Sequence, residues 1–350
     1  MQFFIKKGLA IIILTVFWVL PGTSIATAAP EAWQTIVVKD ANGTQIEIGL
    51  PVKRLVVLNS DALEVIRSLD ASDLVAGVYS GISKNGLFWP KLNGKPKVGS
   101  WKEINYEQVV EVNSDAVLCY GSRPGRDMEK KLAPFGIQVI RLDFYKPATL
   151  IKEVLILGRI LGKEREAEDL AAWYGDHMNH IGRFIEKMPA RPNVYIEGNS
   201  NYHTAAPGAG GHDMCVSSGG NNIAGALSIP YPEVTSEWIV TANPDVVVKV
   251  TTKSAGGSCY SMADARSFES IRADLMDRPA WSHTNAVKSG RVHVIANDIW
   301  TGPRAVVGMY YLVKWFFPDT SPSFHPDQLH RQYLEKFQKI PYQGVYVYPE

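Results

Sequence analysis

Four side chains with metal-ligand atoms, His203, His212, Asp213 and Cys215, lie within a short stretch of the chain. Such atoms can bind a transition metal, so an exported metalloenzyme is one hypothesis. Their spacing matches no standard metal motif, and in the alternative Asp213 caps a helix while His212 lines a cleft. The chain also lacks G-x-S-x-G, H-E-x-x-H and Walker motifs. We therefore predict binding without catalysis, with no cofactor and no resident metal ion.

Aromatic and basic side chains occupy many positions that follow predicted strands. Aromatic rings suit the flat or apolar faces of a metal chelate, and the Arg123 guanidinium suits carboxylate or catecholate charge. Ordinary packing is the alternative role for each ring, and a structural role is the alternative for Arg304. The candidate ligand-binding residues are Tyr79, Trp101, Tyr120, Arg123, Tyr145, Tyr202, His203, His212, Trp300 and Arg304.

A glycine-rich loop at 207–213 precedes a predicted helix. Glycine lets the backbone approach a ligand closely, and a helix N-terminus favours an anion. The loop lacks the third glycine of G-x-G-x-x-G, which argues against nucleotide binding.

The elements that would position these residues alternate between short apolar strands and helices. This alternation predicts an α/β fold with parallel sheets covered on both faces. An Asn-Gly hairpin opens the chain. The predicted strands are 35–39, 45–48, 54–58, 74–79, 116–120, 138–142, 193–197, 246–250 and 291–296. The predicted helices among them are 60–69, 106–112, 128–135 and 236–242.

Two consecutive helical segments interrupt this alternation at 147–187. The second, 164–187, is one helix of about 36 Å that Pro189 and Pro192 end. Such a helix can connect two α/β lobes rigidly, or it can simply pack on one lobe.

Two stretches of the chain resemble each other at a separation of 130 residues. EQVVEVNSDAVL at 107–118 and EWIVTANPDVVV at 237–248 share Glu, Val, Asn, Asp and Val at identical offsets. A repeated helix-turn-strand unit on each side of the long helix predicts two similar lobes.

The first 28 residues have the three parts of a secretory signal peptide, with cleavage expected after Ala28. Cleavage would remove Lys6 and Lys7 and no acid, which lowers the formal net charge from +1 to −1. A near-neutral surface argues against nucleic acid as a partner. No cysteine lies near the cleavage site, so we expect a periplasmic protein without a lipid anchor or membrane insertion. Cys215 and Cys259 either form a disulfide or remain buried thiols.

The order of these motifs resembles the helical-backbone class (class III) of periplasmic substrate-binding proteins. The resemblance rests on the opening hairpin, the GVYS run, the two E-x-x-V-x-x-N-x-D units and AVKSGRVHVIANDIWTGPR near the end. Those receptors serve ABC importers of iron-siderophores, haem and cobalamin. VGSWKEINYE, which contains Trp101, resembles the stretch that supplies an aromatic wall in cobalamin receptors. The W-x-x-P-R-like segment of the family is WTGPR here, which carries over Trp300 and Arg304.

The resemblance implies two Rossmann-like lobes with parallel central sheets, joined by a single long α-helix, with the ligand between them. It implies a monomeric receptor that captures a metal chelate, most simply a ferric siderophore, and delivers it to an ABC permease dimer. A corrinoid or haem ligand, or a signalling partner instead of an importer, are the alternatives. Glu107 and Glu237 correspond to the glutamates that pair with permease arginines. In the alternative, the two carboxylates only interact favourably with the positive N-terminal ends of their own helix dipoles.

These observations predict five segments. They are a signal peptide at 1–28, an N-terminal lobe at 35–146, a helical segment with the linking helix at 147–188, a C-terminal lobe at 189–318, and a C-terminal helix and tail at 319–350. In the tail, a helix at 324–338 should pack against a lobe, and alternating Val345 and Val347 favour an edge strand or a covering flap.

Overall fold

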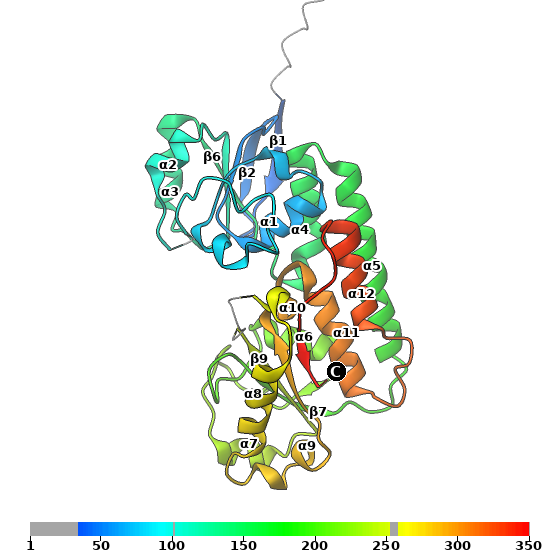
Figure 1. Ribbon diagram of the computed structural model, residues 1–350. Coiled ribbons are helices and arrows are strands. Elements are labelled where there is room, and N and C mark those ends of the chain that lie inside the picture. The colour runs from blue at the N-terminus through cyan, green and yellow to red at the C-terminus, as the bar shows by residue number, and fades with distance from the viewer. Residues whose placement is uncertain (1–33, 101, 253–257, 350) are drawn as a thin grey trace, which may run out of the picture. The chain divides into compact units, whose positions relative to one another are not determined.

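The computed structural model describes residues 34–100, 102–252 and 258–349 (Figure 1). The strands are β1 Gln34–Lys39, β2 Gln45–Leu50, β3 Leu55–Val57, β4 Val75–Val78, β5 Ala116–Cys119, β6 Gln138–Arg141, β7 Asn193–Glu197, β8 Asn221–Asn222, β9 Val246–Thr251, β10 Val292–Ala296 and β11 Val347–Tyr348. The α-helices are α1 Ser60–Ser68, α2 Tyr106–Glu111, α3 Asp127–Leu132, α4 Pro147–Leu161, α5 Glu164–Ile185, α6 Gly210–Ser217, α7 Ser236–Ala242, α8 Arg266–Met276, α9 Asn285–Lys288, α10 Asn297–Trp300, α11 Ala305–Phe316 and α12 Pro326–Gln332. The predicted signal peptide and Trp101 lie outside the described residues.

The first sheet is parallel and has the strand order β4-β3-β5-β6. Its strands are buried on both faces, which is why they are almost wholly apolar. Successive residues point to opposite sides: Leu55 and Val57 join the core on one face, and Val56 joins the core on the other, with Val109 of α2. The predicted covered sheet is therefore confirmed for this lobe. The antiparallel hairpin β1–β2 forms a separate small sheet, also as predicted.

The second sheet has the order β11-β10-β9-β7-β8. The pairs β10–β9, β9–β7 and β7–β8 are parallel, and only β11, from the tail of the chain, is antiparallel. The edge strand predicted near Val345 and Val347 is confirmed. Two parallel-rich α/β lobes, as the sequence predicts, are present.

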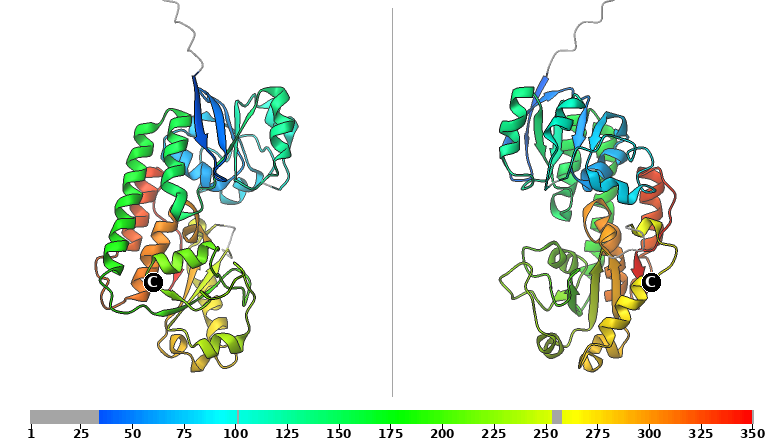
Figure 2. Two further views of the ribbon diagram at one scale, coloured as in Figure 1. Left: turned by 180° about the vertical axis from the view of Figure 1, so that it is seen from behind. Right: turned by 60° about the vertical axis from the view of Figure 1, so that its left-hand side comes forward.

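The chain passes from the first sheet to the second through α4 and α5. Gly162, in the left-handed conformation with φ 63°, ends α4 and lets α5 begin two residues later. A Cβ on Gly158 would lie 2.4 Å from the Cβ of Ala167, so glycine is what allows the two helices to pack closely. Tyr174 of α5 donates a hydrogen bond to the carbonyl of Pro303 (2.7 Å). Thus α5 both connects the sheets and packs along the C-terminal helices, with α11 beside it (Figure 2).

The two repeated units have the same local structure. Asn113 and Asn243 both adopt the left-handed conformation after their helices, with φ of 50° and 43°. The next acid then binds the backbone at the start of the neighbouring strand: Asp115 Oδ2 accepts from Arg54 N (2.7 Å), and Asp245 Oδ2 accepts from Asn193 N (2.9 Å). The repeat inferred from sequence is confirmed, and its shared Asn and Asp have a structural reason.

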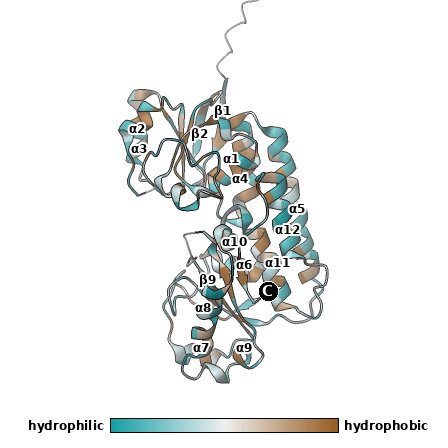
Figure 3. Ribbon diagram, in the orientation of Figure 1, coloured by the Kyte–Doolittle hydropathy of each residue, from teal (hydrophilic) through white to brown (hydrophobic). Residues whose placement is uncertain are grey.

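The C-terminal segment contacts both lobes. Helix α12 continues as a π-helical turn at Tyr333–Phe337, and β11 joins the second sheet. Gln338 Nε2 donates to the carbonyl of Glu64 in α1 (3.0 Å). The apolar helix α11 (Figure 3) is buried between this segment and the rest of the protein. The tail therefore packs against more than the one lobe that we expected.

Cys119, Cys215 and Cys259 are all buried with free thiols, so the alternative of unpaired thiols holds for Cys215 and Cys259. Among the described residues, no helix combines the length and the apolar character needed to span a bilayer.

Candidate functional site

A pocket of about 410 Å³, the main pocket, lies at the carboxyl ends of β7, β9 and β10. Ile196 and Gly198 contribute from the end of β7, Val250 from β9, and Asn297 from the residue after β10. Ligands of parallel α/β sheets collect at this edge because the loops after several strands converge there. The structure thus has a cavity where the sequence argument predicts one.

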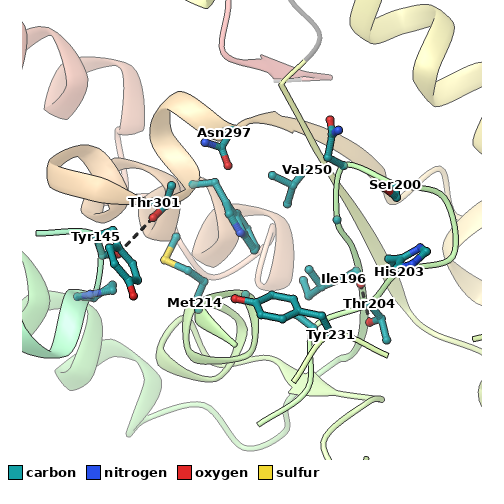
Figure 4. Close-up of a pocket in the computed structure, with 17 residues that line it drawn as sticks. Tyr145, Ile196, Ser200, His203, Thr204, Met214, Tyr231, Val250, Asn297 and Thr301 are labelled. Carbon is teal, nitrogen blue, oxygen red and sulfur yellow. Dashed lines mark hydrogen bonds between the residues drawn. The ribbon is translucent and has the colours of Figure 1, made fainter. Parts of the chain in front are cut away.

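The loop after β7 forms one wall and is held by a buried carboxylate. Glu197 is fully buried, and its Oε1 accepts from Lys249 Nζ (2.8 Å) while Arg278 donates to both oxygens (2.7 and 2.9 Å). The backbone N–H of Tyr202 also donates to Glu197 Oε2 (3.0 Å). We call Glu197, Lys249 and Arg278 the carboxylate triad. It fixes the loop whose Asn199 lines the pocket. Ser200 and His203 of the same loop also line it (Figure 4).

Helix α6 forms a second wall. A Cβ on Gly211 would lie 2.7 Å from the Cβ of Ala205 and 3.4 Å from the Trp300 ring, so glycine is needed for the helix to approach this closely. The N-cap of α6 is Ala209, without a side-chain hydrogen bond, and Asp213 lies one turn further on. The expectation that Asp213 caps this helix is therefore wrong, because the helix begins earlier, inside the glycine-rich loop.

The first lobe closes the pocket through the segment after β6. Tyr145 and Pro147 line the cavity, and Thr301 Oγ1 donates to the carbonyl of Tyr145 (3.2 Å). Figure 4 shows Tyr145 and Thr301 on one side of the pocket and Ser200, His203 and Thr204 on the other. The half-exposed ring of Tyr145 packs edge-on against Tyr120, with centroids 6.0 Å apart.

The main pocket is apolar with neutral hydrogen-bonding groups. No Lys, Arg, Asp or Glu stands among its seventeen lining residues, all of which lie in the described part of the chain. His203 is the only lining imidazole, and its Nδ1 lies 3.0 Å from the carbonyl of Asn201. Such a lining can desolvate and orient a neutral amphipathic molecule. It offers no nucleophile paired with a base and no fixed charge for a strongly ionic ligand.

A smaller pocket of about 180 Å³, the junction pocket, shares Asn297 and Thr301 with the main pocket. Asp61 and Glu64 of α1, and Asp298 and Arg304 near α10, supply its charges. Arg304 Nε lies 2.9 Å from Glu64 Oε1 as an ion pair, in a geometry that makes no hydrogen bond. Arg304 also stacks over the ring of Phe88, 4.7 Å from its centroid.

The carboxyl group of Asp61, which lines the junction pocket, has a strongly raised pKa. Tyr120 donates its hydroxyl to Asp61 Oδ2 (3.0 Å). Burial, the largest cause, and the charges of Glu64 and Asp143 raise the pKa of Asp61, while the Tyr120 hydrogen bond and the charge of Arg304 lower it. The balance takes the pKa from 3.8 to about 7. Asp61 therefore changes its protonation state near neutral pH.

The structure brings Tyr145, His203 and Trp300, of the residues predicted from sequence, to the main pocket. Arg304 lines the junction pocket, and Tyr120 reaches it through Asp61. Ligand contact by any of these residues remains a prediction.

The other predicted residues are placed elsewhere. Tyr202 lines a separate polar cavity beside Lys249 and Arg278. His212 Nδ1 lies 3.0 Å from Asn222 Nδ2, and neither Tyr79 nor the exposed Arg123 lines the main pocket. Among the described residues, no group of three or more His, Cys, Asp or Glu could hold a metal ion.

Several lining residues were not predicted. Val250 and Asn297 stand at strand ends, so the rule that found Trp300 could also have found them. Tyr231 is different, because it belongs to the long loop after β8 and its ring is 67% exposed. Nothing in the local sequence indicates that this loop folds back to the pocket.

Comparisons with known proteins agree with this geometry. Residues 55–299 match the model of the periplasmic binding protein family. The chain is 26% identical over 304 residues to an uncharacterised ABC transporter substrate-binding lipoprotein, YvrC, of Bacillus subtilis, covering 81% of this chain and 86% of the relative. It is 28% identical over 221 residues to a cobalamin-binding protein of Halobacterium salinarum, covering 60% of this chain and 57% of that protein.

A solved structure, the TroA-like periplasmic binding protein FepB from Veillonella parvula, superimposes with a TM-score of 0.75 at 19% identity. The superposition covers 89% of this chain and 99% of that one, so the fold is shared over both lobes. The family match covers most of the chain, and the family consists of non-enzymatic substrate-binding proteins. The chain therefore belongs to the periplasmic binding protein family, as a solute-binding protein of an ABC transporter.

Proposed function

We propose that this protein captures a neutral or weakly charged metal chelate and delivers it to an ABC permease, with a corrinoid as the first candidate. The main support is the absence of Lys, Arg, Asp and Glu from the lining of the main pocket, all within the described residues. Haem propionates and catecholate siderophores carry anionic oxygens that need cationic partners when they leave water. This lining reverses the order expected from sequence, in which a ferric siderophore came first.

A corrinoid presents a broad apolar face and neutral amide arms, which matches the apolar wall and neutral polar groups of the pocket. The relative from Halobacterium salinarum is named a cobalamin-binding protein. A neutral ferric hydroxamate is the second candidate, because the 410 Å³ of the main pocket would enclose only part of a corrinoid.

The test is titration of the purified protein, followed by tryptophan quenching, with cyanocobalamin, a ferric hydroxamate, a ferric catecholate and haem. We expect tight binding of cyanocobalamin, weaker binding of the hydroxamate and none of the two anionic chelates. Tyr231→Ala should weaken binding about tenfold, because an exposed ring lining the pocket is lost. Ile229→Ala is the matched control, being equally exposed but not part of the lining. Preference for the catecholate would contradict the proposal.

We further propose that Glu107 and Glu237 dock the receptor on the permease. Both are exposed and occupy the second position of equivalent helices, α2 and α7. Two like membrane subunits present two like surfaces, which paired carboxylates can meet. The hydrogen bonds of Glu237 with its own backbone and with Thr235 lower its pKa, which supports a local helix-capping role as the alternative for that residue.

The double variant Glu107→Arg with Glu237→Arg separates the two roles. Docking predicts loss of chelate uptake with unchanged chelate affinity and melting temperature, whereas capping alone predicts normal uptake. Exchanging the exposed Glu111 for Arg, outside the first turn of α2, is the control for added positive charge.

The protein should also act in the periplasm without a lipid anchor. Its three cysteines are at 119, 215 and 259, far from the predicted cleavage site, whereas the relative from Bacillus subtilis is a lipoprotein. Mass spectrometry of the exported protein should show an unmodified chain that begins at Ala29, and a lipid-modified N-terminus would contradict this.

A further inference from the structure

The junction pocket adjoins the main pocket, because Asn297 and Thr301 line both. Its volume of about 180 Å³ is enough for a short side arm of a larger ligand. A molecule held in the main pocket would have to pass Asn297 and Thr301 to place an arm in the junction pocket.

The junction pocket contains buried polar atoms without hydrogen-bond partners. Arg304, whose side chain is 8% exposed, has no partner for Nη1 within the described residues. Glu64, whose side chain is 6% exposed, likewise has none for Oε1. Buried donors and acceptors are normally paired because leaving them unpaired costs free energy. Glu64 and Arg304 both line the junction pocket, and beyond the 2.9 Å ion pair between them these atoms make no hydrogen bond within the described residues.

The charges of the junction pocket restrict which arm could enter. Asp61, Glu64 and Asp298 supply three carboxyl groups against the single guanidinium of Arg304. A carboxylate arm would meet three like charges, and an ammonium arm has no acceptor to offer Arg304. A carboxamide has both a carbonyl oxygen for Arg304 and an N–H for Glu64, and it carries no charge to desolvate.

We propose that the junction pocket is a subsite that takes a carboxamide arm of the bound chelate, with Arg304 donating to its oxygen and Glu64 accepting from its nitrogen. This inference rests on the proposed function, because a corrinoid carries several such arms. It goes further by stating which chemical feature of the ligand is selected and where.

The first experiment uses the wild-type protein at pH 8, above the Asp61 pKa of about 7. Cyanocobalamin is compared with its three monocarboxylates, in each of which one propionamide arm is hydrolysed to the acid. We expect one of the three to bind at least tenfold more weakly than cyanocobalamin, because its carboxylate would enter the junction pocket. Equal affinities for all four ligands would overturn the proposal.

The second experiment fills the cavity. Ser60→Leu enlarges a side chain that lines the junction pocket, whereas Ser80→Leu makes the same change at an exposed position that lines neither pocket. Ser60→Leu should bind cyanocobalamin about tenfold more weakly and lose the discrimination between the monocarboxylates. Ser80→Leu should retain both. A Ser60→Leu protein that is folded and discriminates like wild type would also overturn the proposal.

If cyanocobalamin does not bind wild type at all, the corrinoid assignment fails, and small fragments then decide the subsite separately. Saturation-transfer NMR with propionamide should give a signal for wild type that Ser60→Leu lacks, and propionate should give none with either protein. An equal signal from propionamide and propionate, or no propionamide signal, would reject the subsite itself.

Discussion

Two buried charge clusters adjoin the main pocket, and they differ in how completely their hydrogen bonds are made. In the carboxylate triad, Glu197 accepts from Lys249, from both Nη atoms of Arg278, from the Tyr195 hydroxyl and from the backbone of Tyr202. In the junction cluster of Asp61, Glu64 and Arg304, the ion pair between Glu64 and Arg304 lies 2.9 Å apart, yet both side chains keep atoms without hydrogen-bond partners.

The pKa shifts of the two clusters go in opposite directions. Burial raises the pKa of Glu197, but the hydrogen bonds from Arg278 and Lys249 outweigh burial, and the pKa ends below its ordinary value. For Asp61, burial dominates and the pKa rises to about 7. A cluster whose hydrogen bonds are all made (a saturated cluster) positions a loop. A cluster beside a cavity that keeps atoms without hydrogen bonds (an unsaturated cluster) is suited to binding a ligand. The comparison therefore distinguishes charged groups that hold the fold together from charged groups that can still bind a ligand.

Removing one cation of the triad should have the largest effect. Arg278→Met leaves Lys249 as the remaining cation of the triad beside the buried Glu197, and breaking a buried ion pair typically costs about 3 kcal/mol or more of unfolding free energy. Ligand affinity should fall as well, because the 198–204 loop loses its anchor. Urea denaturation and chelate titration measure the two effects. Arg266→Met, which breaks an exposed pair with Asp264, should leave both unchanged.

Exchanging arginine for lysine compares the clusters directly. Arg278→Lys loses the two-pronged contact with Glu197 and should cost about 1.5 kcal/mol, the value of one charged hydrogen bond. Arg304→Lys keeps the positive charge and gives up few hydrogen bonds, so it should cost less than half as much. If both substitutions have the same effect on the urea midpoint, the distinction between a saturated and an unsaturated cluster is wrong.

The smallest effect should appear in the dependence of stability on pH. Between pH 3.8 and about 7, folded Asp61 keeps a proton that the unfolded chain has released, so its contribution to stability falls as pH rises through this window. The charged groups of Glu64, Asp143 and Arg304 and the hydroxyl of Tyr120 that face it should not change this sign. Asp61→Asn should remove the fall, seen in urea midpoints from pH 4 to 8.

Glu197 should behave in the opposite way. Because the pKa of Glu197 is lower in the folded protein than its unfolded value of 4.5, this group stabilises the fold above pH 4.5. The stabilisation is lost as pH falls through the folded pKa. Glu197→Gln should therefore destabilise the protein most at neutral pH and least in acid. A uniform loss at every pH would show that packing, and not charge, determines the effect.

Prediction from sequence worked best where the signal is local. Gly162 ends α4, and Asn113 and Asn243 end their helices because those residues tolerate the left-handed conformation. Of the predicted residues, the pocket lining includes Trp300, which the resemblance carried over, and Tyr145, which follows a predicted strand. Prediction failed for Tyr231, whose place depends on a long loop, and for Asp61, whose importance comes from neighbours far away in the sequence.

The two parallel α/β lobes, the long helix between them, the repeat and the sheet edge that holds the main pocket could be inferred from the amino-acid sequence alone. All of these follow from hydrophobic period, helix-ending residues and strand direction, which are properties of neighbouring residues. The folded structure was needed to show which side chains meet in the main pocket and that, within the described residues, no Lys, Arg, Asp or Glu lines it. It was also needed to show that Asp61, Glu64 and Arg304 share a cavity. Burial and desolvation depend on segments as distant as α1 and the turn before α11, and no local pattern encodes that distance.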